Sequence, residues 1–335
     1  MTRPATLASE ASAQRGDSKA RAPSARKVVA VVVCAAVLLI LPWIIGNEFY
    51  VNMATQVLIY ALFALSLNVL IGFTGNISFG HAAYFAIGGY ACAILLTTYG
   101  WPLALALPAA VVLAGLVAAV VGFFCVRLTQ IYFAMLTLAF AMLVWGVAFK
   151  WKEVTGGDDG FTGIKMPAMI SHHVGYFYFT LITVAAGITA LWVICHSAFG
   201  LTLVAIRENS VRAGFIGVDT RHMRWAAFTV AGTFGGLAGA LFGMYHRGMY
   251  IENAFWTESA NVLIMVLLGG IYSFVGPIFG AAVLYLLQVF TNQYTTYWPT
   301  VLGLILLVIV LVLPDGLIGL VARVKARLGA HGGRT

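Results

Sequence analysis

Long apolar runs separated by short polar segments repeat along the chain and limit what it can fold into. A helix needs about 20 mostly apolar residues to cross the hydrocarbon core of a bilayer, so we predict an all-α, polytopic transmembrane helix bundle of about ten spans. The apolar segments lie near 28–45, 51–71, 77–98, 102–126, 131–149, 176–196, 225–245, 259–271, 277–291 and 299–313.

Composition and charge exclude several classes of protein. Charged residues make up 9% and hydrophobic residues 61% of the chain, whereas soluble domains carry about 25% charged residues. The net charge of +8 comes from basic residues in short segments between apolar runs, without a basic patch interleaved with aromatics, so no nucleic-acid partner is expected. No lysine is followed by Ser or Thr, so the chain lacks a phosphate-binding P-loop and needs no cofactor of its own.

The distribution of Lys and Arg predicts orientation, because cytoplasmic loops are enriched in both. Basic residues concentrate in the tail 1–27, in the loop 201–224 and in the tail 314–335. We therefore expect a disordered cytoplasmic N-terminal tail, a transmembrane domain at 28–313 and a cytoplasmic C-terminal tail. The loop 150–175, which mixes lysines with acidic residues, is expected on the external, periplasmic side.

Glycine, serine or proline interrupts the third segment and the eighth and ninth segments. Residues 72–89 read GFTGNISFGHAAYFAIGG. Non-helical backbone at membrane depth is tolerated only where protein or a watery cavity covers it. All three segments are expected to be broken or re-entrant. Residues 72–89 are therefore expected to face the interior, either along a transport path or as a close-packed helix hairpin.

Few polar groups lie in or beside these interrupted spans, and polar groups in lipid are costly. The candidates for the substrate path are Asn68, Ser78, His81, Tyr84 and Asn261. Charged residues are scarce in the marked spans, which argues against an ion-coupled secondary carrier.

The sequence predicts neither an enzyme nor a metal site. Ser78 and His81 are three residues apart, but no acid nearby would orient the histidine and the G-x-S-x-G pattern is absent. Asp158 and Asp159 do not form a calcium-loop motif, and the four cysteines form no C-x-x-C pair.

Glycines spaced four apart in apolar segments let a neighbouring backbone approach closely. We expect helix packing at Gly235, Gly239, Gly243, Gly276 and Gly280.

If transport is driven by ATP, a separate polypeptide must hydrolyse it, and the cytoplasmic loop 201–224 is the best candidate for the contact with that polypeptide. A short helix over about 203–215 is plausible and would suit a groove in a partner protein. An ordinary amphipathic loop anchored at the membrane interface is the alternative.

Several ordered motifs resemble one family. These are LNVLIGFTGNISFGHAAYFAIGGYACAIL, TGGDDGFTGI, AIRENSVRAGFIGVD, RWAAFTVAGTFGGLAGAL, VLLGGIYSFVGPIFGAAVL and PDGLIGL, which together cover roughly residues 50–320. They are similar to the LivM-type permease subunits of branched-chain amino acid ABC importers.

The resemblance implies a multi-pass protein of the bacterial inner membrane with both termini in the cytoplasm. It implies a second related permease, two ATP-binding subunits that use the ATP, and a periplasmic substrate-binding protein. It also implies alternating access driven through a coupling helix, which corresponds to AIRENSVRAGFIGVD and carries Ala205, Ile206, Arg207, Glu208 and Gly217. Urea and short-chain amide permeases resemble the same motifs, so they stay open beside amino acids, and a stand-alone carrier is the remoter alternative.

Overall fold

The computed structural model describes residues 47–128, 130–164, 166, 170–294 and 297–312, with Leu39, Pro42, Trp43, Gly316, Leu317 and Gly319 in addition. Residues 48–335 form one compact unit, separate from 1–47. The expected tail 1–27 and most of the first span and of the C-terminal tail lie outside the described residues.

The described elements are almost entirely helical, which confirms the all-α membrane fold. The main helices are α3 (Glu48–Asn68), α4 (His81–Thr97), α5 (Leu103–Cys125), α6 (Gln130–Lys150), α8 (His173–His196), α11 (Thr220–Tyr245), α12 (Trp256–Gly269), α13 (Gly276–Tyr294) and α14 (Trp298–Val312). Among the described residues, five helices are long and apolar enough to cross a membrane: α3 with its continuation to Thr74, α5, α6, α8 and α11. The helices α4 and α12 are apolar but shorter.

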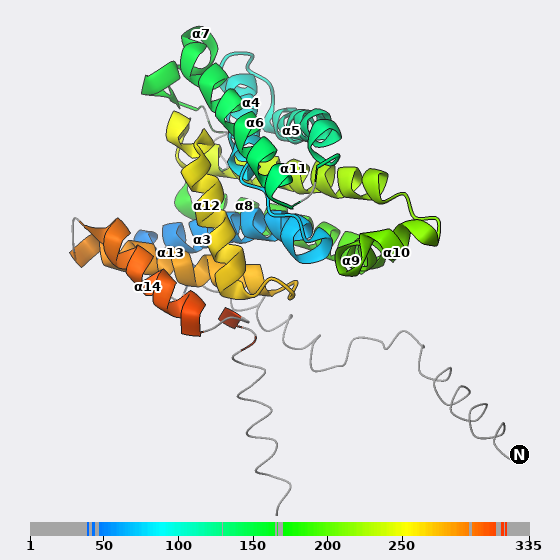
Figure 1. Cartoon of the computed structure of the whole chain (residues 1–335). Coiled ribbons are helices and arrows are strands. Elements are labelled where there is room, and N and C mark those ends of the chain that lie inside the picture. Colours follow the sequence, from blue (N-terminus) through cyan, green and yellow to red (C-terminus); the bar gives the residue numbers. More distant parts are fainter. Residues whose placement is uncertain are drawn as a thin grey trace, which may run out of the picture. The chain divides into compact units, whose positions relative to one another are not determined.

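Two of the spans form the centre of the bundle. The apolar windows of α3 and α11 are 78% and 72% buried, whereas those of α5, α6 and α8 are only 22–33% buried. Helix α11 packs against α4, α5 and α3 (Figure 1). The outer helices therefore present their apolar faces outward, as lipid contact requires.

Small residues allow the central helices to approach closely. A Cβ at Gly239 of α11 would lie 1.8 Å from the carbonyl oxygen of Phe85 in α4. A Cβ at Gly280 of α13 would lie 1.9 Å from the carbonyl oxygen of Met265 in α12. Only glycine fits at these two crossings, because any side chain would overlap the neighbouring backbone.

Two helix breaks follow the Gly-rich segments. Helix α3 continues as the π-helix η1 (Val69–Thr74) and ends at Gly75, whose φ is +75°. Residues 75–80 are non-helical, so the third apolar segment, expected to begin near 77, becomes helical only at His81. The second break joins α12 to α13 at 270–275, where Gly270 has a φ of +110°. Left-handed backbone of this kind favours glycine.

The expected loop 150–175 contains short elements that fasten it to the segment after α11. These are α7 (Lys152–Thr155), the 3-10 turn η2 (Gly157–Asp159) and β1 (Phe161–Thr162). Strand β1 pairs antiparallel with β2 (Gly248–Met249), with Phe161 opposite Met249. The 3-10 turn η4 (Ile251–Ala254) then leads into α12.

The prediction of one helix over about 203–215 was wrong. Two helices occupy the region, α9 (Ala198–Glu208) and α10 (Ser210–Phe215). Asn209 separates them with extended backbone at φ −158° and ψ 98°, and its side-chain oxygen accepts a hydrogen bond from Arg212 N at 2.9 Å. Asparagine competes with the helix in this way because its short side chain caps the helix that follows.

Candidate functional site

Arg207, near the end of α9, contacts both helix breaks. Its Nη1 donates to the carbonyl oxygen of Gly72 in η1 at 2.5 Å. Its guanidinium carbon lies 4.9 Å from the ring centroid of Tyr272, in the turn between α12 and α13. The stem of Arg207 also lies against Gly75, where a Cβ would be 3.0 Å from Arg207 Cγ. A single side chain thus joins α9 to both interrupted segments, and we call these contacts the Arg207 junction.

Asn68 extends the Arg207 junction into the bundle. Its buried side-chain nitrogen donates to the carbonyl oxygen of Ser273 at 3.2 Å, which ties the end of α3 to the turn that carries Tyr272. Its Oδ1 has no hydrogen-bond partner among the described residues. A Cβ at Gly72 would lie 2.6 Å from this oxygen, so the glycine leaves room for the amide.

The rest of the loop 201–224 has an anchored face and an open face. Gly200, Leu203 and Ile206 are buried, and α9 packs on η1, α8 and α11. Ala205 and Gly217 are exposed. Val211, Phe215 and Ile216 are 65%, 86% and 80% exposed. Adjoining exposed apolar side chains on α10 and the turn after it are typical of a surface that meets another protein or the membrane.

Charge pairing at the end of α9 is local. Arg207 Nη2 lies 2.6 Å from Glu208 Oε1, with the Arg207 side chain 21% and the Glu208 side chain 68% exposed. An exposed pair of this kind contributes under about 1 kcal/mol. Glu208 therefore contributes little to the fold of the isolated chain and remains available to a partner.

Asp219 starts α11 immediately after this loop. Its Oδ1 accepts hydrogen bonds from Arg221 N at 3.1 Å and His222 N at 3.0 Å. The bonds from the His222 backbone and side chain lower the pKa of the Asp219 carboxyl group below its ordinary value. The cap fixes where the loop ends and the spanning helix begins.

The five expected path residues lie in three different settings, and of these only His81 and Tyr84 are in ring contact among the described residues, with centroids 6.1 Å apart. Asn68 belongs to the Arg207 junction, whereas Ser78, His81 and Tyr84 are 0%, 0% and 3% exposed in the core. His81 stacks on Phe63 with a centroid distance of 5.3 Å, and its Nε2 lies 2.8 Å from Ser66 Oγ. Its other ring nitrogen has no partner among the described residues.

Asn261, the fifth, lies in α12 beside Glu258. Its Nδ2 donates to Glu258 Oε2 at 3.3 Å, and the side chain of Tyr60 in α3, against which α12 packs, lies near the same carboxylate. Glu258 is half-buried in the first turn of α12, three residues before Asn261. That i, i+3 spacing at the start of an apolar helix was the available signal.

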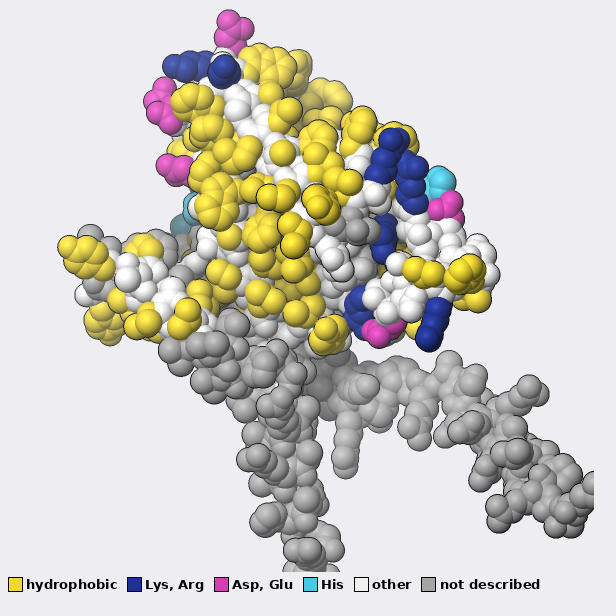
Figure 2. Space-filling model, viewed as in Figure 1, with side chains coloured by type: hydrophobic (Ala, Val, Ile, Leu, Met, Phe, Trp, Pro, Cys, Tyr) yellow, Lys and Arg dark blue, Asp and Glu magenta, His cyan; other side chains and the backbone are white. Residues whose placement is uncertain are grey.

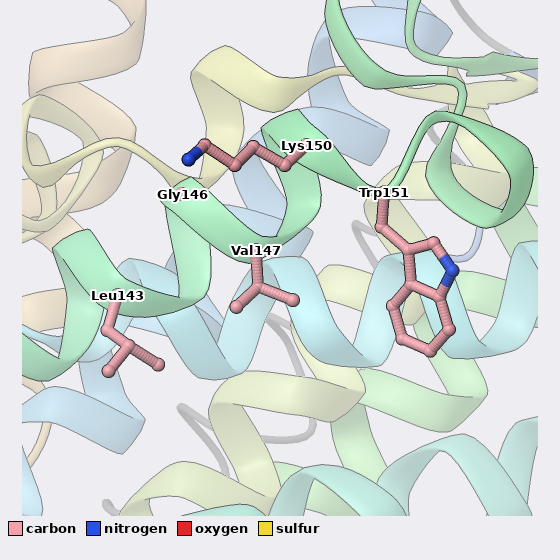
Figure 3. A pocket seen from close by; sticks show the side chains of 5 residues that line it. All are labelled: Leu143, Gly146, Val147, Lys150 and Trp151. Atoms are coloured by element: carbon pink, nitrogen blue, oxygen red, sulfur yellow. The ribbon is translucent and has the colours of Figure 1, made fainter.

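A hollow on the outer face of α6 offers no binding chemistry. Leu143, Gly146, Val147, Lys150 and Trp151 line it, all from α6 and the residue that follows it (Figure 3). Its lining is apolar except for one lysine, and no set of polar groups converges on it. Among the described residues, no group of three His, Cys, Asp or Glu side chains is arranged to hold a metal ion.

Residues 49–313 match the family described as "Branched-chain amino acid transport system / permease component". The chain belongs to this permease family. The match covers both helix breaks and the whole loop 201–224, so the Arg207 junction lies within the family's domain.

Curated relatives agree with this assignment. The permease is 28% identical to the high-affinity branched-chain amino acid transport system permease protein LivM of Escherichia coli (strain K12), over 84% of this chain and 73% of the relative. It is 29% identical to LivM of Salmonella typhimurium, over 80% and 69%. It is 21% identical to the permease protein LivH of Escherichia coli (strain K12), over 78% and 91%. No solved structure matches the chain.

Proposed function

We propose that this permease is one of two related membrane subunits of an ABC importer for branched-chain amino acids. In this proposal it lies in the bacterial inner membrane and catalyses no covalent chemistry. Separate ATP-binding subunits hydrolyse ATP, and a periplasmic protein delivers the amino acid. Similarity to both LivM and LivH supports a pair of permeases, because two related chains then occupy one system.

The Arg207 junction is the observation that carries the mechanism. The exposed apolar side chains Val211, Phe215 and Ile216 offer a docking surface for the ATP-binding subunit. Movement of the docked loop reaches η1 through the Arg207–Gly72 hydrogen bond and reaches the α12–α13 turn through Tyr272. Two packed arrangements of these breaks would give alternating access.

The charge pattern supports an orientation. Lys and Arg side chains gather over the end of the described bundle that carries α9 and α10, while basic and acidic side chains mix around α7 (Figure 2). Cytoplasmic segments are rich in Lys and Arg. We therefore assign the α9–α10 end to the cytoplasm and the α7 end to the periplasm, with both termini cytoplasmic.

The test is uptake by the reconstituted system. The permease, its partner permease and the ATP-binding subunits are placed in proteoliposomes with the binding protein, and radiolabelled leucine, isoleucine, valine, urea and a short-chain amide are offered in turn. ATP-dependent uptake of the branched-chain amino acids is expected. Uptake of urea or the amide but not of the amino acids would contradict the proposed substrate. Uptake without the ATP-binding subunits would contradict the proposed mechanism.

A further inference from the structure

We infer that the Glu258 carboxylate binds the ammonium group of the amino acid as it passes through this permease. This inference rests on the proposed function and adds a binding site to it. The site would also include the Tyr60 hydroxyl and the ring of Tyr285.

The depth of Glu258 in the membrane can be inferred from the position of its neighbour Tyr60 in α3. The spanning element Glu48–Thr74 has 27 residues, and Tyr60 is near its middle. At 1.5 Å per residue, the Tyr60 Cα lies about 18 Å along the helix from Glu48. Helix α12, which carries Glu258, packs on α3, and the Glu258 carboxylate interacts with the Tyr60 side chain, so the carboxylate lies beside the middle of this span. A carboxylate at this depth is costly and is typically retained for function.

The carboxylate has a donor but no cation. Asn261 Nδ2 donates a hydrogen bond to it, and the Tyr60 side chain lies nearby. Among the described residues, the carboxylates in ion pairs belong to Glu48, Glu208 and Asp219. Glu258 thus has no cationic partner among the described residues, and because burial disfavours its charged form, a bound cation would offset the cost of ionising it.

Aromatic rings and further polar groups extend the site. The rings of Tyr60 and Tyr285 lie 5.8 Å apart, and a tyrosine face attracts an ammonium group. One helical turn before Tyr60, Gln56 Nε2 lies 2.9 Å from His246 Nε2 at the end of α11. Polar groups therefore run along α3 from its N-terminal end toward Glu258. An ammonium ion fits this lining better than a second anion does.

A structural role for Glu258 is the rival explanation. Its position in the first turn of α12 lets the carboxylate complement the positive end of the helix dipole. Glu258→Gln distinguishes the two roles, since it keeps the side-chain length and an oxygen that can accept from Asn261 but removes the charge. Glu258→Asp keeps the charge on a shorter side chain. Glu252→Gln is the matched control, because Glu252 is exposed in the neighbouring turn η4.

The experiment measures leucine uptake and binding-protein-stimulated ATP hydrolysis in the reconstituted importer. Loss of a charge-assisted hydrogen bond predicts that Glu258→Gln lowers uptake about 10- to 100-fold. Assembly and stimulated hydrolysis should stay within about twofold of the unaltered importer, Glu258→Asp should recover part of the uptake, and Glu252→Gln should transport normally.

Normal uptake by Glu258→Gln would overturn the site, and so would equal losses in Glu258→Gln and Glu258→Asp. Loss of assembly in Glu258→Gln would assign the residue a structural role instead. If the unaltered importer takes up no branched-chain amino acid, the proposed function fails, whatever the variants do.

Discussion

The guanidinium group of Arg207 donates a hydrogen bond to the carbonyl oxygen of Gly72, which lies 135 residues earlier in the chain. Gly72 is in a π-helix, whose backbone departs from the regular helical hydrogen-bonding pattern. Segments of this kind inside helices are frequent at functional sites. The contact therefore joins the loop 201–224 to an irregular part of the bundle.

Gly239→Leu is expected to disrupt the bundle. A Cβ at this position would lie 1.8 Å from the Phe85 carbonyl oxygen, so α11 and α4 must separate. Overpacking of a well-packed core typically costs about 1–3 kcal/mol or more. Membrane abundance and detergent stability of the permease measure the effect. Gly146→Leu is the control, because nothing lies within 4 Å of its Cβ position on α6. Equal abundance of both variants would contradict the close approach.

Gly217→Leu should act through the backbone rather than through a clash. Gly217 has a φ of +88° and nothing lies within 4 Å of its Cβ position. A leucine in left-handed backbone costs roughly 1–2 kcal/mol, so the end of α10 should rearrange. We expect a folded permease that retains less ATP-binding subunit in a pull-down. Gly214→Leu is the control with equal space and no positive φ, and equal retention by both variants would show that the turn is not needed.

Glu208→Arg should leave the fold intact and weaken docking. The Glu208 side chain is 68% exposed, and its pair with Arg207 contributes little. A charge desolvated in a partner's groove is worth more, with about 2–5 kcal/mol lost when one partner of the pair is removed. Co-purification of the ATP-binding subunits measures the loss. Full association of the ATP-binding subunits together with full transport would show that the docking surface does not include Glu208.

Orientation is testable by labelling intact cells with an impermeant thiol reagent. A cysteine at Asp159, in the exposed turn η2, should react, whereas one at the exposed Asn209 should not. The described native cysteines, Cys92, Cys125 and Cys195, are buried, and Cys34 is replaced beforehand. The reverse pattern, with Asn209 labelled and Asp159 protected, would invert the assignment.

The apolar segments predict the helical membrane fold well, because the bilayer imposes a minimum length and an apolar surface on any helix that crosses it. The glycine spacing also points to positions such as Gly239, where the structure has a close helix crossing. Local chemistry was harder to predict. The cap formed by Asn209 divides one expected helix into two. A helical pattern of apolar residues does not show that the Asn209 side chain competes with the helix for backbone hydrogen bonds.

Contacts between residues far apart in the chain could not be predicted from the sequence. Arg207 was expected to face a partner protein, but its contacts with Gly72 and Tyr272 join segments far apart in the sequence. Glu258 lies at the edge of an apolar run, where the sequence does not indicate that α3 packs beside it. His81 and Ser66 likewise pair across two helices.

Arg207→Ala tests the coupling mechanism most directly, through the number of leucine molecules imported per ATP hydrolysed in proteoliposomes. Removing this charge-assisted hydrogen bond costs about 1.5–3 kcal/mol, so η1 should no longer follow the docked loop. Arg212→Ala is the matched control, since Arg212 is an exposed arginine in α10. The account predicts that Arg207→Ala keeps its ATP-binding subunits and its hydrolysis but imports at least about tenfold less leucine per ATP, while Arg212→Ala keeps the normal ratio. An unchanged ratio in Arg207→Ala would contradict it.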